Sequence, residues 1–325
     1  MYERVREDRR VGYKMTENFG KDQTNQKTEA EVKEITKIRE QELFDAYELI
    51  KDTVVVIKIL RKIPVLIEDR VEIKEIVIGH GSGFIYNMNR VSFVFTAQHV
   101  ISDLKKNERI QILLKQKDGQ WITDNNVQVF FEDAEHDIAA LFLSADANSL
   151  SSVELSKFVF NPSTLLKVGV RVTYCGFPYI SNKGEFIPVF QQGMIAGIDT
   201  GRFKDNKFAY IIDGMVNPGN SGGPAFVGTG KEVIGIISAY IKPMLPGPRL
   251  VIIDGDETID LLSRSAGLGL VVPVNYAVDR LRLEINKLAQ AAESEKNKEA
   301  ITQEQKQESD ESQVNLKKII ASRLK

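Results

Sequence analysis

The chain has 325 residues, of which 42% are hydrophobic and 27% are charged, and its formal net charge is −2. This length suits one large domain or two small ones, and the near-zero charge gives no electrostatic basis for nucleic-acid binding. The single cysteine, Cys175, excludes an intrachain disulfide and fits a reducing compartment. No apolar run approaches the roughly 18 residues of a membrane span, and the charged first residues do not form a secretory signal. We therefore expect a protein that is either cytoplasmic or cleaved from a larger precursor, and that does not bind membranes.

The N-terminal region is predicted in two parts. Residues 1–27 are polar and mixed in charge, which predicts disorder. Residues 28–51 have a helical pattern, and the apolar positions on one side favour a helix packed on its own domain over a coiled coil. These positions are Val32, Ile35, Leu43, Ala46, Leu49 and Ile50.

Residues 52–285 are expected to form the main domain, and residues 286–325 a charged tail that is helical or partly disordered. Short apolar runs such as DTVVVIKIL, RIQILLK and EVIGIISAY predict strands through most of the domain. A polar break near residues 145–168 divides these strands into two halves. The segment VNYAVDRLRLEINKLAQAAE then predicts a helix with Val278, Leu281, Ile285 and Leu288 on one side.

The segment NPGNSGGPAF, residues 217–226, places small residues around Ser221. Glycines allow a sharp turn and a close approach of substrate, and backbone N–H groups in such a turn could stabilise an oxyanion. A plain surface turn between two strands would have the same composition. A catalytic role therefore requires a base and an acid elsewhere in the chain.

Three histidines are candidates for the base. His99 follows the apolar run of residues 93–95, which predicts an imidazole at the end of a buried strand. His80 lies in the glycine-rich segment IVIGHGSGF, where we expect a loop, and His136 lies between two acidic residues, where we expect exposure. His99 is therefore the favoured base.

The acid is expected at the start of the strand-like segment DIAALFL. Asp137 precedes this apolar run, and a carboxylate there would be costly to bury unless it were paired. Asp133 and Glu135 lie in a polar run, where we expect them to be solvated. Asp137 is therefore the favoured partner of His99.

The segments TAQHV, DIAALFL and GNSGGPA together resemble the trypsin-like (chymotrypsin-fold) serine proteases in the order His, Asp, Ser. GHGSGFIY, VTYCGFP, EVIGIISAY and GLGLVVPVNYAVDRL make the resemblance closest to the HtrA/Deg branch, over about residues 50–285. The resemblance implies an all-β fold of two antiparallel β-barrels, at about 52–145 and 169–275, with flanking helices. The chain after residue 285 is too short for the PDZ module common in that branch, so we expect none.

The resemblance also implies roles for individual residues. Ser221 would be the nucleophile, His99 the general base and acid, and Asp137 the group that orients His99. The backbone N–H groups of Gly219 and Ser221 would form the oxyanion hole. Ser238 would support Asp137.

Further residues would bind the substrate. Ser238, Ala239 and Tyr240 would pair with the substrate backbone. Met215, six residues before the nucleophile, would lie at the base of the primary specificity pocket. An apolar base predicts cleavage after small or medium apolar residues, because it offers no partner to a buried charge.

These residues favour a serine endopeptidase that acts on proteins or peptides without a cofactor or metal. The alternative is a catalytically idle protease-fold scaffold or binding module. A regulatory partner could engage the terminal helices. The long connection at residues 241–266 predicts a gate at the specificity pocket or an idle surface insertion, and within it we expect a short strand at 250–253 and a helical turn at 259–262.

Overall fold

The computed structural model describes most of the chain between residues 23 and 294. The described ranges are 23–67, 70–88, 91–145, 147–152, 166–178, 186–205, 207–227, 232–240, 249–253, 256–260, 267–291 and 293–294. Residues 1–22 and most of the charged tail lie outside the described residues, so their disorder stays a prediction. Residues 23–27, for which disorder was also predicted, belong to a helix that begins at Gln23.

Contacts divide the chain into two units, residues 1–44 and 45–325. Helix α1 (Gln23–Ile50) begins in the first unit and ends in the second. Of the predicted apolar stripe, Val32 and Ile35 are exposed, whereas Ile50 is fully buried. Among the described stripe residues, Ile50 at the C-terminal end belongs to the core of the second unit, and the packing of the rest of the helix stays a prediction.

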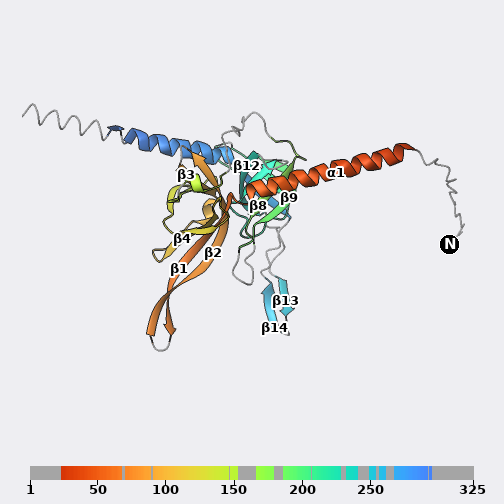
Figure 1. The fold of residues 1–325 in the computed structure, drawn as a ribbon. Helices are drawn as coiled ribbons and strands as arrows, with labels where there is room; N and C mark the ends of the chain where they lie inside the picture. The colour runs from red at the N-terminus through yellow and green to blue at the C-terminus, as the bar shows by residue number, and fades with distance from the viewer. Residues whose placement is uncertain are drawn as a thin grey trace, which may run out of the picture. The chain divides into compact units, whose positions relative to one another are not determined.

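The second unit begins with a seven-stranded antiparallel sheet (Figure 1). Its order is β5-β4-β1-β2-β3-β7-β6, and residues 125–127 join the two outermost strands, β5 and β6. Since so short a connection spans only about 10–15 Å, the sheet must curl until its edges approach each other. The strands are β1 (Val54–Ile67), β2 (Arg70–Met88), β3 (Val91–Thr96), β4 (Glu108–Lys115), β5 (Trp121–Asp124), β6 (Gln128–Asp133) and β7 (Ile138–Phe142), and the short helices η1 (Gln98–Val100) and η2 (Ala147–Ser149) complete this half.

The other half of the second unit is a closed antiparallel barrel in the order β10-β15-β12-β11-β8-β9. The predicted all-β fold is thus confirmed, although only this half closes through strand pairing in the described part of the chain. The barrel strands are β8 (Arg171–Gly176), β9 (Val189–Asp199), β10 (Ala209–Asp213), β11 (Pro224–Val227), β12 (Glu232–Tyr240) and β15 (Leu268–Pro273).

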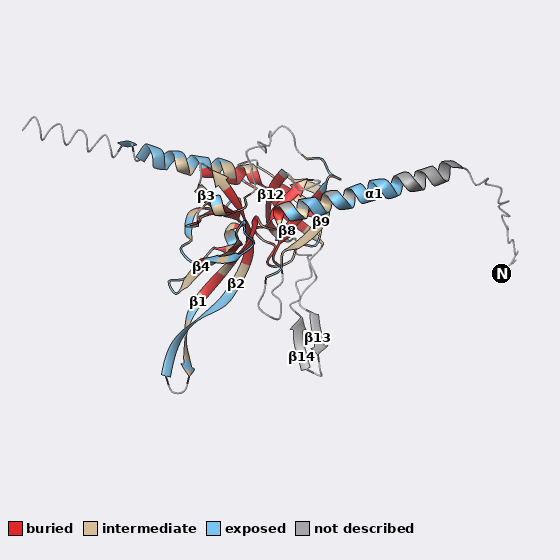
Figure 2. Ribbon diagram, viewed as in Figure 1, coloured by how far each residue is buried: buried red, intermediate tan, exposed pale blue. Residues whose placement is uncertain are grey.

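The core explains why the central strands are apolar on both faces. Along β1, Val54 and Val56 belong to a cluster shared by both halves, whereas Val55 and Ile57 fill the interior of the first sheet. Side chains alternate between the faces of a strand, so two buried faces require a continuous apolar run. Figure 2 shows this buried interior in red, in contrast to the exposed far end of the β1–β2 hairpin.

Residues 274–291 form a helix that follows β15. Leu281 is fully buried, and Val278 and Ile285 pack against the shared cluster, whereas Leu288 is exposed. The helix therefore covers the core with the predicted face, apart from the last of its four positions. No helix in the described residues has an apolar stretch long enough to cross a bilayer.

The connection at residues 241–266 is described only in part. Strand β13 (Arg249–Ile253) pairs with β14 (Asp256–Asp260), and the other residues of the connection lie outside the described ranges. The predicted short strand is present. The predicted helical turn is wrong where it begins, because residues 259 and 260 pair with β13 instead. The gate stays a prediction.

Candidate active site

His99 and Asp137 meet where two neighbouring strands of the first sheet, β3 and β7, end and begin. His99 lies in η1, directly after β3, and Asp137 directly precedes β7, which pairs with β3. The imidazole Nδ1 lies 2.8 Å from Asp137 Oδ2 and 3.0 Å from Oδ1, and the backbone N–H of His99 donates to Oδ1 at 2.9 Å. One carboxylate thus fixes both the ring and the backbone of His99. The ring's other nitrogen has no hydrogen bond to a described residue, and His99 is exposed.

The barrel contributes a third group to this pair. Ser238 in β12 is buried, and its hydroxyl donates to Asp137 Oδ2 at 2.5 Å. Asp137 is half-buried rather than buried as expected, because its His99 side is open to solvent. Three hydrogen bonds to the Asp137 carboxylate offset the cost of its partial desolvation.

Ser221 lies in the turn that precedes β11. Gly219 and Gly222 have φ values of 93° and 87°, in the region that favours glycine. The N–H groups of Asn220, Gly222 and Gly223 donate to backbone carbonyls, whereas those of Gly219 and Ser221 have no hydrogen-bond partner in the described part of the chain. The turn therefore keeps two donors available, and they are the two that the resemblance assigns to an oxyanion hole.

Ser82 in β2 holds this turn from the opposite sheet, a role that the sequence analysis missed. Its hydroxyl donates to the Gly219 carbonyl at 2.6 Å and accepts from Phe177 N–H at 2.9 Å, and its own N–H donates to the Ser221 carbonyl at 2.8 Å. The residue is fully buried. The GSGF segment contained the only signal, since a serine between two glycines inside a strand leaves room for close contact with another backbone.

Ser221 comes from the second half of the domain and His99 from the first, and no hydrogen bond joins their side chains in the described structure. Such contacts are commonly long in unliganded sites and tighten when substrate binds. A cavity of about 290 Å³ lies on the Asp137 side of His99 and is lined by Phe203, Leu270 and Val272 among others. The site thus has open space next to the imidazole.

The predicted substrate-binding residues are placed as follows. The backbone of residues 238–240 belongs to β12, which pairs with β15 there but with β11 only over residues 232–236. One edge of this segment is therefore free of a partner strand among the described residues. Met215 is 60% exposed among the described residues, and its place at the specificity pocket stays a prediction. The backbone carbonyl of Met215 accepts from the Tyr174 hydroxyl at 3.0 Å.

Two of the histidine expectations are wrong. His80 lies within β2, paired with Lys58, and not in a loop; its Nε2 is buried, and burial lowers the pKa of the imidazole. His136 is only 5% exposed, because Asp133 and Asp205 face its two ring nitrogens. Asp133 is accordingly half-buried rather than solvated, whereas Glu135 is exposed as expected.

Cys175 is buried in β8, as expected for a core residue. Burial raises the pKa of its thiol, which disfavours the reactive thiolate. Its pairing with Phe190 in β9 places it in the barrel wall. Cys175 is therefore part of the core and not a second nucleophile.

Comparisons with known proteins agree with this geometry. Residues 81–236 match the family described as "Trypsin-like peptidase domain". The chain is 28% identical over 208 residues to a "Probable periplasmic serine endoprotease DegP-like" of Rickettsia conorii, covering 62% of this chain and 34% of the relative. It is 32% identical over 173 residues to "Serine protease Do-like HtrA" of Lactobacillus helveticus, covering 51% and 37%. The crystal structure of Deg5 aligns with a TM-score of 0.49 at 20% identity, over 74% of this chain and 92% of that one.

Residues 81–236 are thus similar to the trypsin-like peptidase domain. The chain is related to the HtrA/Deg serine proteases, as its motifs indicated. It spans about a third of the length of the curated relatives described above. The name of the Rickettsia relative describes a periplasmic protein, so these relatives do not support the expected cytoplasmic location.

Proposed function

We propose that this chain is a serine endopeptidase that cleaves protein substrates through an acyl-enzyme intermediate. The observation that carries the proposal is the hydrogen-bonded set of His99, Asp137 and Ser238, which lies beside a serine turn with two available N–H donors. This arrangement provides a base, an orienting acid and an oxyanion site, the three parts that acyl transfer by serine requires.

In the first step, Ser221 Oγ attacks the carbonyl carbon of the scissile bond while its proton passes to His99 Nε2. Asp137 holds His99 in the tautomer with a proton on Nδ1 and stabilises the imidazolium that forms. The carbonyl oxygen becomes an oxyanion that accepts hydrogen bonds from the N–H groups of Gly219 and Ser221. Each donor of this kind is worth about 100- to 1000-fold in rate.

In the following steps, His99 donates its proton to the leaving amine, and the peptide bond breaks. Water then gives a proton to His99 and attacks the ester carbonyl; the ester C–Oγ bond breaks, His99 returns the proton to Ser221 Oγ, and the acid product leaves. The free edge of residues 238–240 would pair with the substrate backbone on the acyl side. Met215 would favour small or medium apolar residues before the scissile bond.

The test is digestion of an unfolded protein mixture by the purified chain, followed by labelling of the new N-termini. We expect cleavage after Val, Ala, Leu or Ile, and no new termini with Ser221→Ala or His99→Ala. Cleavage that persists in Ser221→Ala would overturn the proposal, and a profile dominated by Lys and Arg would overturn the specificity. A chain that remains inactive on all substrates would favour the idle scaffold. Control by a partner or by residues 241–266 stays a prediction.

A further inference from the structure

The turn that carries Asp137 has an unusual backbone. Asp137 has a φ of 54°, one of only two positive values outside glycine among the described residues. A left-handed conformation is less favourable for a residue with a side chain than for glycine. The turn therefore needs support from its neighbours to present the carboxylate to His99.

Asp133 supplies part of this support. Its Oδ1 accepts from the backbone N–H groups of Glu135 and His136, both at 3.1 Å, and thereby closes the turn. Its Oδ2 lies 2.8 Å from Nδ1 of the His136 ring. Burial opposes the charge of Asp133, but the hydrogen bonds from His136 outweigh it and lower the pKa of the carboxyl.

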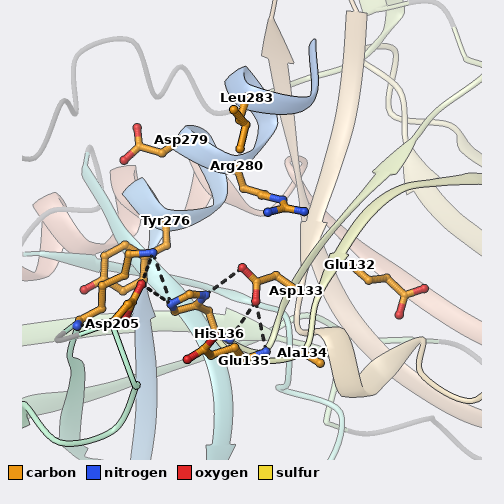
Figure 3. Close-up of a pocket in the computed structure, with 11 residues that line it drawn as sticks. Glu132, Asp133, Ala134, Glu135, His136, Asp205, Tyr276, Asp279, Arg280 and Leu283 are labelled. Atoms are coloured by element: carbon orange, nitrogen blue, oxygen red, sulfur yellow. Dashed lines mark hydrogen bonds and ion pairs between the residues drawn. The ribbon is translucent and has the colours of Figure 1, made fainter. Parts of the chain in front are cut away.

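The His136 ring extends the support to the barrel. Its Nε2 lies 3.1 Å from Oδ2 of Asp205, which belongs to the connection between β9 and β10. Figure 3 shows the imidazole between Asp133 and Asp205, with Tyr276 beside it. The ring packs 4.9 Å from Phe203 and 5.6 Å from Tyr276, measured between centroids. His136 thus joins the Asp137 turn to the second half of the domain.

Charged side chains lie next to the contact between His136 and Asp205, although the His136 ring is buried. Lys207 Nζ lies 2.7 Å from Asp205 Oδ2 and 3.3 Å from His136 Nε2, and it sits over the Tyr276 ring. The hydrogen bond from Lys207 lowers the pKa of Asp205 to about 2. From the C-terminal helix, the charge of Arg280 also lowers the pKa of Asp133. Both carboxylates are therefore ionised at neutral pH.

We infer that His136 is a positioning residue for Asp137, with Asp205 as its anchor on the barrel. The inference rests on the proposed function. His136 directly precedes Asp137, so a ring held at both nitrogens limits the rotation of the turn. When the anchor is lost, the turn relaxes, and the Asp137 carboxylate moves away from His99 Nδ1. The sequence showed no sign of this, because Asp205 lies 69 residues after His136.

The kinetic test uses Asp205→Ala, since the Asp205 side chain is 39% exposed and its removal leaves the core packing intact. We expect kcat to fall about 10-fold with little change in KM, far less than the roughly 10,000-fold loss when an orienting aspartate itself becomes asparagine. Lys204→Ala, on the same connection, is the matched control and should retain full kcat. In an Asp137→Asn background, Asp205→Ala should have no further effect. An equal loss in both backgrounds, or no loss in either, would overturn the inference.

A second readout does not depend on peptidase activity. The chain has three histidines, so histidine-selective isotope labelling gives three resolvable imidazoles. We expect the low-field Nδ1 proton of His99, bonded to Asp137, to weaken or move in Asp205→Ala and to remain in Lys204→Ala, both in a Ser221→Ala background. An unchanged His99 signal would overturn the positioning role. If the signal shifts while the native chain cleaves nothing, the positioning role stands and the proposed function fails.

Discussion

Ser82→Ala is the most informative single substitution, because Ser82 connects the first sheet to the serine turn. The change removes the hydroxyl that satisfies the Gly219 carbonyl and the Phe177 N–H, and both groups stay buried. Each buried group without a partner costs about 1–3 kcal/mol, so the free energy of unfolding should fall by about 2–6 kcal/mol. The Gly219 carbonyl belongs to the peptide between the two oxyanion donors, so this part of the turn also loses an anchor.

The fall in kcat expected for Ser82→Ala has an upper bound. Complete loss of one oxyanion donor costs about 100- to 1000-fold, and Ser82→Ala loosens a donor without removing it. We therefore expect kcat to fall by about 10-fold or more with little change in KM, since the donor acts on the transition state. Urea denaturation gives the stability, and hydrolysis of a fluorogenic peptide gives the rate.

Ser92→Ala is the matched control. Ser92 is also buried in the first sheet, but its hydroxyl donates to Asn87, which is not part of the site. Its loss should cost about 1 kcal/mol and leave kcat unchanged. If Ser82→Ala lowered stability as expected but had the same kcat as Ser92→Ala, Ser82 would be a purely structural residue and the reasoning would be refuted.

Three further predictions follow from single observations. In Gly222→Ala, the new Cβ would lie 2.0 Å from the Ser82 carbonyl oxygen, so we expect a large fall in Tm and loss of activity. Gly169→Ala is the control, because Gly169 has a similar φ and nothing within 4 Å, and it should lower Tm only slightly. Equal falls in Tm for the two variants would contradict this prediction. Cys175 should not react with a thiol reagent in the native protein and should react fully in urea; rapid native labelling would show that it is accessible. The pKa of Asp205 is lowered to about 2, so the stability that its carboxylate contributes above about pH 4 should be lost as pH falls toward 2. In the native chain the urea midpoint should therefore fall with pH over this range, and Asp205→Ala should make that fall smaller. The same pH dependence in both proteins would refute the prediction.

Much of the fold and site could be predicted because the signals are local. Continuous apolar runs such as residues 54–57 indicated strands, and in the structure both faces of this run are buried. His99 and Asp137 each stand at an end of a strand, and β3 pairs with β7, so their meeting follows from the sheet. The glycines around Ser221 indicated a tight turn, and two of them, Gly219 and Gly222, have the positive φ values that favour glycine.

The two wrong histidine predictions depended on distant partners. His136 looked exposed because acidic neighbours flank it, yet Asp205 and Phe203 from the barrel bury its ring. His80 looked like a loop residue because of the adjacent glycines, but those glycines let β2 pass close to the serine turn: a Cβ on Gly219 would lie 2.8 Å from His80 Nε2. No window of sequence around either histidine contains the residues that decide its environment.

Labelling with a fluorophosphonate probe tests the central claim most directly, because only an activated serine reacts with it rapidly. The purified chain should become labelled at Ser221, as located by mass spectrometry of the modified peptide. Labelling should fall to background in His99→Ala and Ser221→Ala, while Ser92→Ala should react like the native chain. Labelling that is absent from the native chain, or that persists in His99→Ala at the native rate, would contradict the assignment of an active serine peptidase site.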